Sequence, residues 1–225
     1  MVKAEDLTAG QTPRSPESVW LGRAPSRRRR GAAPGVKHLD RERIVTAAVR
    51  LLDAEGEARF SMRRLASELE VTAMSLYWYV DTKDDLLELA LDAVTGRMEL
   101  PDPADAGRDW QDDLHALALA WRRAMIARPW ALHCYGRFPH PGPHGLRFSE
   151  HVQAVLARSP LPDALRPTAL SAVLRFLFGS ASLEGRWTAP GRQPHDQEAE
   201  QDFHRGLGWL LSGMGMDASV RDRRR

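Results

Sequence analysis

The sequence predicts an all-α protein made of two helical parts. Apolar residues recur at i, i+3, i+4 and i+7 through most of the chain, the spacing of one helix face. Residues 61–80 contain two such stretches, both very short and separated by a tight turn. The proline- and glycine-containing segment PDPADAG, at residues 101–107, separates this region from a second set of helical patterns.

Composition limits the class of protein. A chain of 225 residues with 43% hydrophobic residues is long enough for one or two domains with a real core. The net charge is only +2, so any affinity for nucleic acid must come from a local patch. Cys134 is the single cysteine, which excludes an intrachain disulfide and fits a reducing compartment. No apolar run approaches the roughly 18 residues of a membrane span, and no signal peptide is evident. We therefore expect a cytoplasmic protein without a membrane partner.

Residues 1–37 are expected to form a disordered basic arm, because they are rich in proline, glycine, serine and arginine. Four consecutive arginines, at residues 27–30, could contact a nucleic-acid backbone or minor groove. The alternative is a solvated tail.

The first helix is expected from its N-cap Asp40 to about Ala54, with Gly56 ending it.

Residues 61–83 read SMRRLASELEVTAMSLYWYVDTK and carry the most informative pattern. Ser61 and Thr72 are suited to cap two short helices, the second over residues 73–80. Two short helices joined by a tight turn form a helix-turn-helix, whose second helix can enter the major groove of DNA. Three adjacent aromatics at 77–79 lie mostly off the inward stripe, so they either contact DNA or complete the core.

A further helix is expected from an N-cap at Asp81 to about Met98. Lys83 opposes the helix dipole at that start, unless a phosphate binds there. The alternative is a solvated lysine. We expect residues 38–83 to form the helix-turn-helix domain and residues 84–100 to form the helix that links it to the rest.

The motif over residues 39–87 resembles the TetR (tetracycline repressor) family. The match lies in LEVTAMSLYWYVDTK, at residues 69–83, and in SMRRLA, at residues 61–66. The resemblance implies an all-α homodimer with an N-terminal three-helix helix-turn-helix DNA-binding domain and a C-terminal helical ligand-binding and dimerisation domain. One departure is Glu70, which stands where the family usually has glycine in the turn. A positive φ there would cost roughly 1 kcal/mol.

The resemblance also assigns DNA contacts. It places Arg63, Met74, Tyr77 and Tyr79 at base edges, and Thr72, Ser75, Trp78 and Lys83 at phosphates. Ala73 can offer only its methyl group, for example to a thymine.

The second domain, expected over residues 101–217, has its own helical patterns. Helices are expected over residues 110–127, 146–157, 165–184 and 203–214, with residues 130–145 as a loop or short turns. The 165–184 stretch is apolar nearly all round, which indicates burial on both sides. We expect two chains to share it and the last helix across a two-fold axis. Residues 218–225 are expected to be a disordered tail.

Large apolar side chains in this domain indicate a pocket for a largely apolar small molecule. The alternative for each is ordinary core packing. The candidate ligand-binding residues are Trp121, Met125, Trp130, His133, Phe138, Phe148, His151, Phe176 and Trp187.

Other chemistry is poorly supported. His133, Cys134, His140, His144 and His151 lie close in sequence, but the prolines around them oppose the helical spacing that zinc ligands need. His133 or His151 could still contact a metal-chelated ligand. No nucleophile elbow, phosphate-binding glycine loop or zincin motif occurs, so we expect no enzyme, no metal site and no cofactor.

The sequence thus predicts a ligand-responsive DNA-binding regulator, and we expect a repressor released from a palindromic operator by a small molecule. Two alternatives remain: an architectural DNA-binding dimer without a ligand, and an enzyme with a fused DNA-binding head. A pocket below roughly 300 Å³ would favour the first. The ligand, the operator and the sign of regulation are not encoded in any recognisable pattern.

Overall fold

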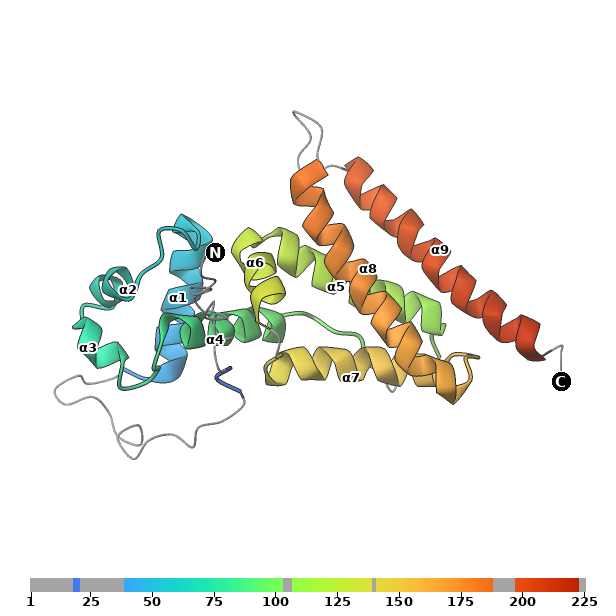
Figure 1. The fold of residues 1–225 in the computed structure, drawn as a ribbon, viewed down its shortest axis with the longest axis horizontal. Coiled ribbons are helices and arrows are strands. Elements are labelled where there is room, and N and C mark those ends of the chain that lie inside the picture. Colours follow the sequence, from blue (N-terminus) through green and yellow to red (C-terminus); the bar gives the residue numbers. More distant parts are fainter. Residues whose placement is uncertain (1–17, 21–38, 103–106, 139–140, 188–196, 223–225) are drawn as a thin grey trace, which may run out of the picture.

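The computed structural model describes residues 18–20, 39–102, 107–138, 141–187 and 197–222, with the helical backbone alone for 185–187 and 217–222. The described residues form helices throughout, without strands, which confirms the all-α prediction (Figure 1). The helices are α1 (Arg41–Glu55), α2 (Met62–Glu68), α3 (Ala73–Leu76), α4 (Lys83–Gly96), α5 (Trp110–Ile126), α6 (Pro129–Arg137), α7 (Pro143–Arg158), the short 3₁₀ helix η2 (Asp163–Leu165), α8 (Arg166–Trp187) and α9 (Gln197–Asp222).

The predicted caps of the N-terminal helices are confirmed. The Asp40 carboxylate accepts the Arg43 backbone N–H at 2.7 Å and starts α1. The hydroxyls of Ser61 and Thr72 accept backbone N–H groups three residues later and start α2 and α3. Each cap satisfies a donor that the first helical turn leaves unpaired, so the local sequence sets where these helices begin.

Two details of this region differ from prediction. Helix α3 ends at Leu76, and residues 77–79 continue as turns rather than as helix to Val80. The N-cap of α4 is Thr82, not Asp81, because the Thr82 hydroxyl accepts the Asp85 N–H at 2.9 Å. The Asp85 carboxylate accepts the Asp81 N–H in return at 3.2 Å, which completes a capping box.

The larger differences lie in the second half of the chain. Residues 129–137, expected as loop, form α6, because Pro129 occupies the first helical position, where its missing N–H costs nothing. Helix α7 begins at Pro143 for the same reason. The backbone of α9 runs from Gln197 to Asp222, longer than the expected 203–214, and includes residues 218–222 that we expected in the tail.

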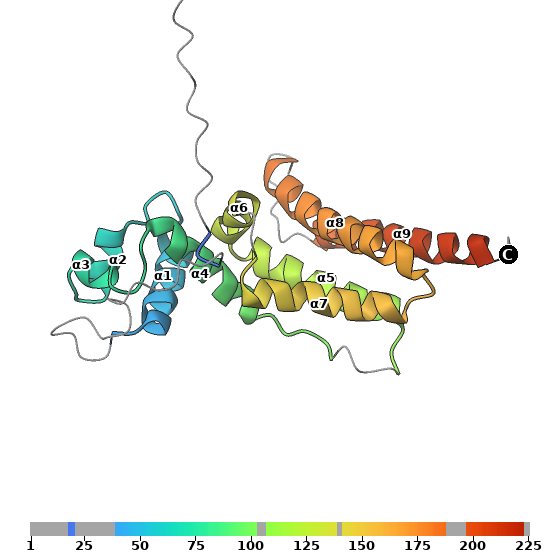
Figure 2. The ribbon, with the colours of Figure 1, turned by 60° about the horizontal axis from the view of Figure 1, so that its bottom comes forward.

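A single continuous core joins the two parts of the chain, and α4 belongs to both. Leu86 and Leu87, near the start of α4, are fully buried, and α1 packs there. Val94, near its end, is buried where α4 packs against α7. Figure 1 shows α4 lying between α1–α3 and the remaining helices. Figure 2 shows α5 and α7 running side by side beneath α8 and α9.

Glu70 adopts the positive φ that a glycine would favour. Its φ of 55° is the one positive value among the non-glycine residues that the structure describes. The turn between α2 and α3 therefore requires the left-handed conformation, in which a side chain crowds the following carbonyl group. Glu70 is therefore a point of local backbone strain between two capped helices.

Replacing Glu70 with glycine should relieve this strain. We expect Glu70→Gly to raise the free energy of unfolding by roughly 1 kcal/mol, measured by urea denaturation. Glu99→Gly is the control, because Glu99 is an exposed residue without a positive φ and should gain nothing. Equal changes in the two variants would show that the turn is not strained.

Candidate DNA-binding surface and ligand pocket

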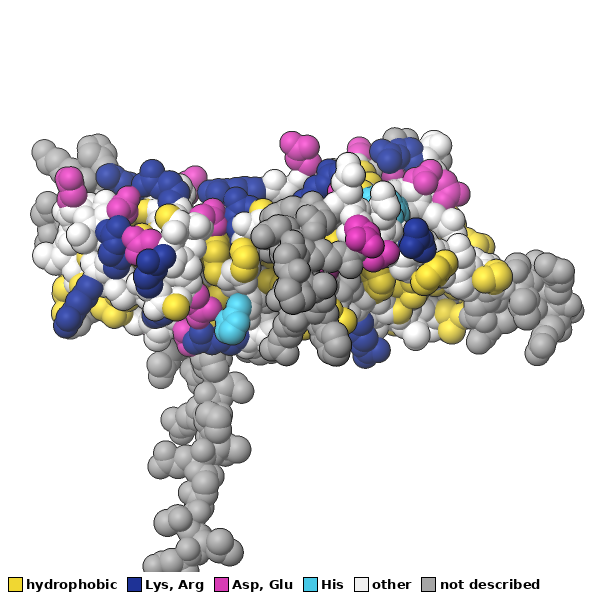
Figure 3. Space-filling model, turned by 90° about the horizontal axis from the view of Figure 1, so that it is seen from above, with side chains coloured by type: hydrophobic (Ala, Val, Ile, Leu, Met, Phe, Trp, Pro, Cys, Tyr) yellow, Lys and Arg dark blue, Asp and Glu magenta, His cyan; other side chains and the backbone are white. Residues whose placement is uncertain are grey.

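The exposed side of the helix-turn-helix carries the residues expected to read DNA. Met74 and Tyr77 are 69% and 43% exposed, although both are large and apolar, and Arg63 and Thr72 are also exposed. Leu76 and Val80 point into the core between them. Lys and Arg side chains gather at the left end of the surface in Figure 3, where α1–α3 lie. Exposed apolar groups beside cations are typical of an interface rather than of a solvated face.

The other expected DNA contacts are less exposed. Ala73, Ser75 and Trp78 are half-buried. Tyr79 is also half-buried, and its hydroxyl donates to the Leu39 carbonyl oxygen at 2.6 Å. This bond ties the end of the helix-turn-helix to the residue before the α1 cap, so Tyr79 completes the core and we withdraw its assignment to base edges.

Lys83 is half-buried at the first position of α4, next to the N-cap Thr82. Its ammonium nitrogen lies 5.6 Å from the centroid of the buried Phe60 ring, a cation–π distance. The Phe60 ring holds the Lys83 side chain beside the free backbone N–H groups at the start of α4. The lysine and these N–H groups are therefore placed to bind a single phosphate.

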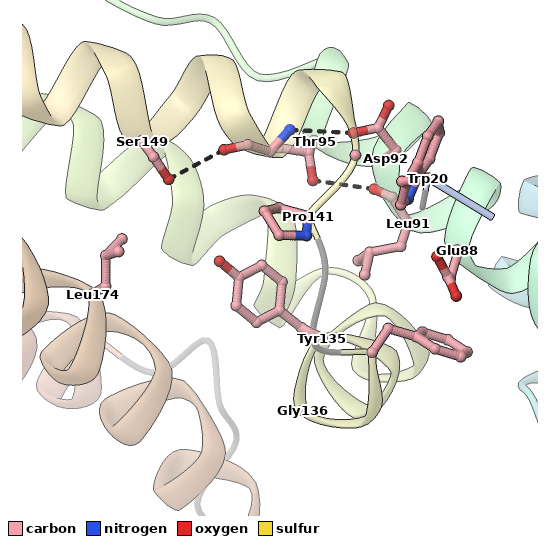
Figure 4. Close-up of a pocket in the computed structure, with 13 residues that line it drawn as sticks. Trp20, Glu88, Leu91, Asp92, Thr95, Tyr135, Gly136, Pro141, Ser149 and Leu174 are labelled. Carbon is pink, nitrogen blue, oxygen red and sulfur yellow. Dashed lines mark hydrogen bonds between the residues drawn. The ribbon is translucent and has the colours of Figure 1, made fainter. Parts of the chain in front are cut away.

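A cavity of about 350 Å³ opens between α4, α6, α7 and α8, as Figure 4 shows. Its volume exceeds the roughly 300 Å³ below which we would have favoured a purely architectural protein. Apolar groups line most of it, with two carboxylates and several hydroxyls. The lining residues are Trp20, Glu88, Leu91, Asp92, Thr95, Tyr135, Gly136, Phe138, Pro141, Gly142, Gly145, Ser149 and Leu174.

Asp92 joins the cavity to two helices. From α4, one carboxylate oxygen accepts the backbone N–H groups of His144 at 2.9 Å and Gly145 at 3.1 Å, and so caps α7. Burial raises the pKa of Asp92, while these hydrogen bonds oppose the shift. Gly142 allows the approach, because a Cβ there would lie 2.4 Å from the Asp92 carboxyl group. A molecule that contacts Asp92 therefore acts on α4 and α7 together.

Glu88, one turn before Asp92 on α4, is 3% exposed and also lines the cavity. Its carboxylate accepts a hydrogen bond of 2.5 Å from the hydroxyl of Ser18, which belongs to the N-terminal region. The expected arm therefore includes an ordered part, Ser18–Trp20, whereas residues 1–17 and 21–38 lie outside the described residues.

Most of the expected ligand-binding residues do not line this cavity. Phe138 does line the cavity. Trp130 and His133 instead face α1: the Trp130 indole donates to Asp53 at 2.8 Å, and the exposed His133 lies 3.9 Å from Glu57. Both lie on the side of α6 that contacts the DNA-binding head, while Tyr135 and Gly136 turn to the cavity.

The remaining candidates are not among the residues that line the cavity. Trp121, Met125 and Phe148 are buried core residues, and Trp121 meets the Tyr135 ring edge-on at 5.6 Å between centroids. Phe176 packs on Phe203 of α9. The His151 ring bonds to the Arg147 carbonyl within α7, and the Trp187 side chain lies outside the described residues.

The sequence of α4 contained a detectable signal for residues that line the cavity. Glu88, Leu91, Asp92 and Thr95 share one helix face by their spacing of three and four, and this face packs against the second domain. Charged residues on a buried helix face indicate a site more specifically than large apolar residues do, since buried carboxylates need partners.

The histidines around α6 and α7 do not gather. No group of three His, Cys, Asp or Glu side chains suited to a metal occurs within the described part of the chain, and His140 lies outside it. Burial also raises the pKa of the Cys134 thiol to about 12. The described helices include none that is long and apolar enough to cross a membrane.

An exposed apolar face lies on α8 and α9. Leu183, Trp209 and Met216 are 52%, 72% and 63% exposed. Figure 3 shows hydrophobic side chains over its right half, where Figure 1 places α8 and α9. A face of this kind is typical of a subunit interface.

Comparisons with known proteins agree with this arrangement. The family model for bacterial regulatory proteins of the tetR family matches residues 44–90, and that for the tetracyclin repressor-like C-terminal domain matches residues 101–208. An HTH-type transcriptional regulator of Saccharopolyspora erythraea is 40% identical over 207 residues, covering 81% of this chain and 87% of that protein. The HTH-type transcriptional repressor DrrR1 of Streptomyces coeruleorubidus is 35% identical over 199 residues, covering 88% and 67%.

Among solved structures, the TetR family protein ActR of Streptomyces coelicolor in complex with actinorhodin is similar, with a TM-score of 0.66 and 26% identity. The match covers 80% of this chain and 96% of ActR. Proteins of this family act as homodimers, which accounts for the exposed α8 and α9 face. The chain belongs to the TetR family of ligand-responsive, DNA-binding transcriptional regulators.

Proposed function

We propose that the protein is a cytoplasmic repressor whose dimer places two α3 helices in successive major grooves of a near-palindromic operator. A small molecule in the cavity between α4, α6, α7 and α8 releases it. The observation that carries this proposal is α4 itself, which lines the cavity with Glu88 and Asp92 and begins at Lys83 in the DNA-binding head. We assign it no catalytic step, since its relatives are regulators.

The lining suggests more about the effector than apolar character alone. Leu91, Phe138 and Leu174 suit a flat apolar body, while Glu88 and Asp92 accept hydrogen bonds. We therefore propose an effector that carries donor groups, such as hydroxyls or an amine, on an apolar frame. ActR, whose structure holds actinorhodin, supports an aromatic ligand by analogy.

Release requires unequal binding to two conformations. Glu88 and Asp92 lie one turn apart on α4, so a ligand that fills the cavity bears on that helix directly. Because an α-helix transmits displacement along its axis, a shift at Asp92 moves Lys83 and the α3 region with it. The two heads of the dimer then no longer match half-sites one helical turn apart.

The operator can be found by sequencing genomic DNA fragments that the purified protein retains. We expect a near-palindrome with half-sites separated by one helical turn or a multiple of it. Fragments that share no inverted repeat would contradict a dimer that reads DNA through two α3 helices.

Two variants should distinguish a residue that contacts base edges from one that contacts phosphates. Arg63→Ala should weaken operator binding by roughly 1–3 kcal/mol and relax the preference at one operator position. Lys83→Ala should weaken all sequences about equally and lower the salt slope by about 0.9. Fluorescence anisotropy with single-base operator variants measures both. If Arg63→Ala kept the wild-type preference among the operator variants, Arg63 would not contact a base edge.

Tyr79 should behave as a core residue. Tyr79→Phe leaves the Leu39 carbonyl without its donor and should lower the free energy of unfolding by about 1 kcal/mol. Operator preference should stay as in the wild type, in contrast to Tyr77→Phe at the exposed neighbour. A changed base preference in Tyr79→Phe would restore the base-reading role that we withdrew.

Filling the cavity should uncouple the effector from DNA. Compounds are first screened for release of labelled operator. An active compound should lose its effect on Ser149→Trp, because the indole would occupy the space that the compound needs. Gln153→Trp is the matched control, one turn later on α7 and exposed. Loss of response in both variants, or in neither, would place the effector elsewhere.

A further inference from the structure

The N-terminal segment Ser18–Trp20 is docked on the same residues that form the cavity. Ser18 is 5% exposed and donates to Glu88 at 2.5 Å, and the Trp20 backbone N–H donates to the Ser18 hydroxyl at 3.3 Å. Trp20 itself lines the cavity, as Figure 4 shows beside Asp92 and Glu88. Segment and cavity are therefore one site, although 70 positions separate Ser18 from Glu88 in the chain.

The packing of Trp20 is close. A Cβ built on Gly142 would lie 2.6 Å from the Trp20 ring and 2.4 Å from the Asp92 carboxyl group, so the glycine leaves room for both. The indole thus covers the loop before α7, beside the carboxylate that caps this helix. With Trp20 in place, the 350 Å³ cavity is near the lower end of ligand pockets, and a larger occupant would have to move the indole.

The segment places in the cavity the same kinds of group that we propose for the effector, a hydrogen-bond donor and an apolar aromatic ring. Ser18 supplies a hydroxyl donor to a buried carboxylate, and Trp20 supplies a flat aromatic surface. Both features match the donor-bearing apolar frame that the lining calls for. An effector whose donor takes the position of the Ser18 hydroxyl at Glu88 has to displace that hydroxyl.

Chain connectivity makes this docking intramolecular. Residues 21–38, 18 in number, connect Trp20 to Leu39, whose carbonyl is held by Tyr79 in the DNA-binding head. A tether of this length gives the segment a local concentration on the order of millimolar. A weakly held segment therefore still competes with an effector present at micromolar concentration.

We propose that Ser18–Trp20 is a tethered occupant of the effector site, which the effector displaces from Glu88 when it binds. This inference rests on the proposed function of the cavity as the effector site. The segment then sets a threshold: the effector's apparent affinity is its intrinsic affinity multiplied by the fraction of protein with the segment undocked. Small molecules that bind without reaching Glu88 leave the segment in place and do not meet this threshold.

The test compares the wild type with the Ser18→Ala/Trp20→Ala double variant as full-length proteins. The probe is N-phenyl-1-naphthylamine, an aromatic amine that becomes fluorescent in apolar sites. We expect the double variant to bind the probe roughly five- to tenfold more tightly, because the competing segment is lost. Ser67→Ala/Leu146→Ala, at exposed positions that do not line the cavity, is the matched control and should bind as the wild type does.

A second measurement follows the segment directly. Protein labelled with 5-fluorotryptophan gives a fluorine signal for Trp20, assigned by its loss in Trp20→Phe. Saturating probe should move this signal to its position in a free peptide of residues 14–24, while the Trp130 signal, held by Asp53, stays. A Trp20 signal already at the free-peptide position without probe would overturn the docking itself.

The remaining outcomes separate the two proposals. Weaker probe binding to the double variant would show that the ligand contacts the Trp20 side chain instead of displacing it. This result would contradict the proposed displacement but would leave the cavity as the effector site. Equal binding to both proteins would contradict the displacement too. Absence of probe binding to both proteins, with no fluorine response, would overturn the cavity as an effector site and the inference with it.

Discussion

Helix α4 is the constraint on which the rest of the structure depends, because one rigid element is buried in both halves of the molecule. Leu86 and Leu87 complete the core of the DNA-binding head, and Val94 completes that of the ligand domain. A helix of 14 residues spans about 21 Å and resists axial compression, since each backbone N–H is tied to the preceding turn. The halves therefore cannot move independently at this contact, and the cavity is placed where its occupant bears on the shared helix.

A second connection runs through α6. Arg137 donates to Glu57 after α1 at 2.9 Å and to Asp84 on α4 at 2.6 Å, while Trp130 holds Asp53 of α1. Ion pairs this exposed add little stability, but they fix the position of α6 against the head. Since Tyr135 and Gly136 of the same helix line the cavity, the two faces of α6 contact the cavity and the head. Displacement of α6 would therefore reinforce displacement of α4.

Local signals made much of the fold predictable, and tertiary context decided the rest. Asp40, Ser61 and Thr72 cap their helices as predicted, because a cap needs only the N–H groups two or three residues later. Helix α6 was missed because a proline reads equally as a helix breaker and as a first helical residue. Most candidate ligand-binding residues do not line the cavity, because size and apolarity do not say which way a side chain faces. Glu88 and Asp92, on the buried face of α4, line it and were the better signal for it. The ordered segment Ser18–Trp20 was not predicted, because it lies in a region whose composition is typical of disorder.

The energies involved suit a switch controlled by few contacts. Allosteric couplings in proteins are typically about 1–3 kcal/mol, and a hydrogen bond to a charged group contributes about 1.5–3 kcal/mol. One donor placed on Asp92 or Glu88 in only one conformation of α4 is therefore enough to shift operator affinity by one to two orders of magnitude. Both carboxylates already hold hydrogen-bonded partners, the α7 backbone and Ser18, so an effector exchanges bonds rather than adding them. The selectivity of the switch then depends on how well the effector's donors replace those of the chain.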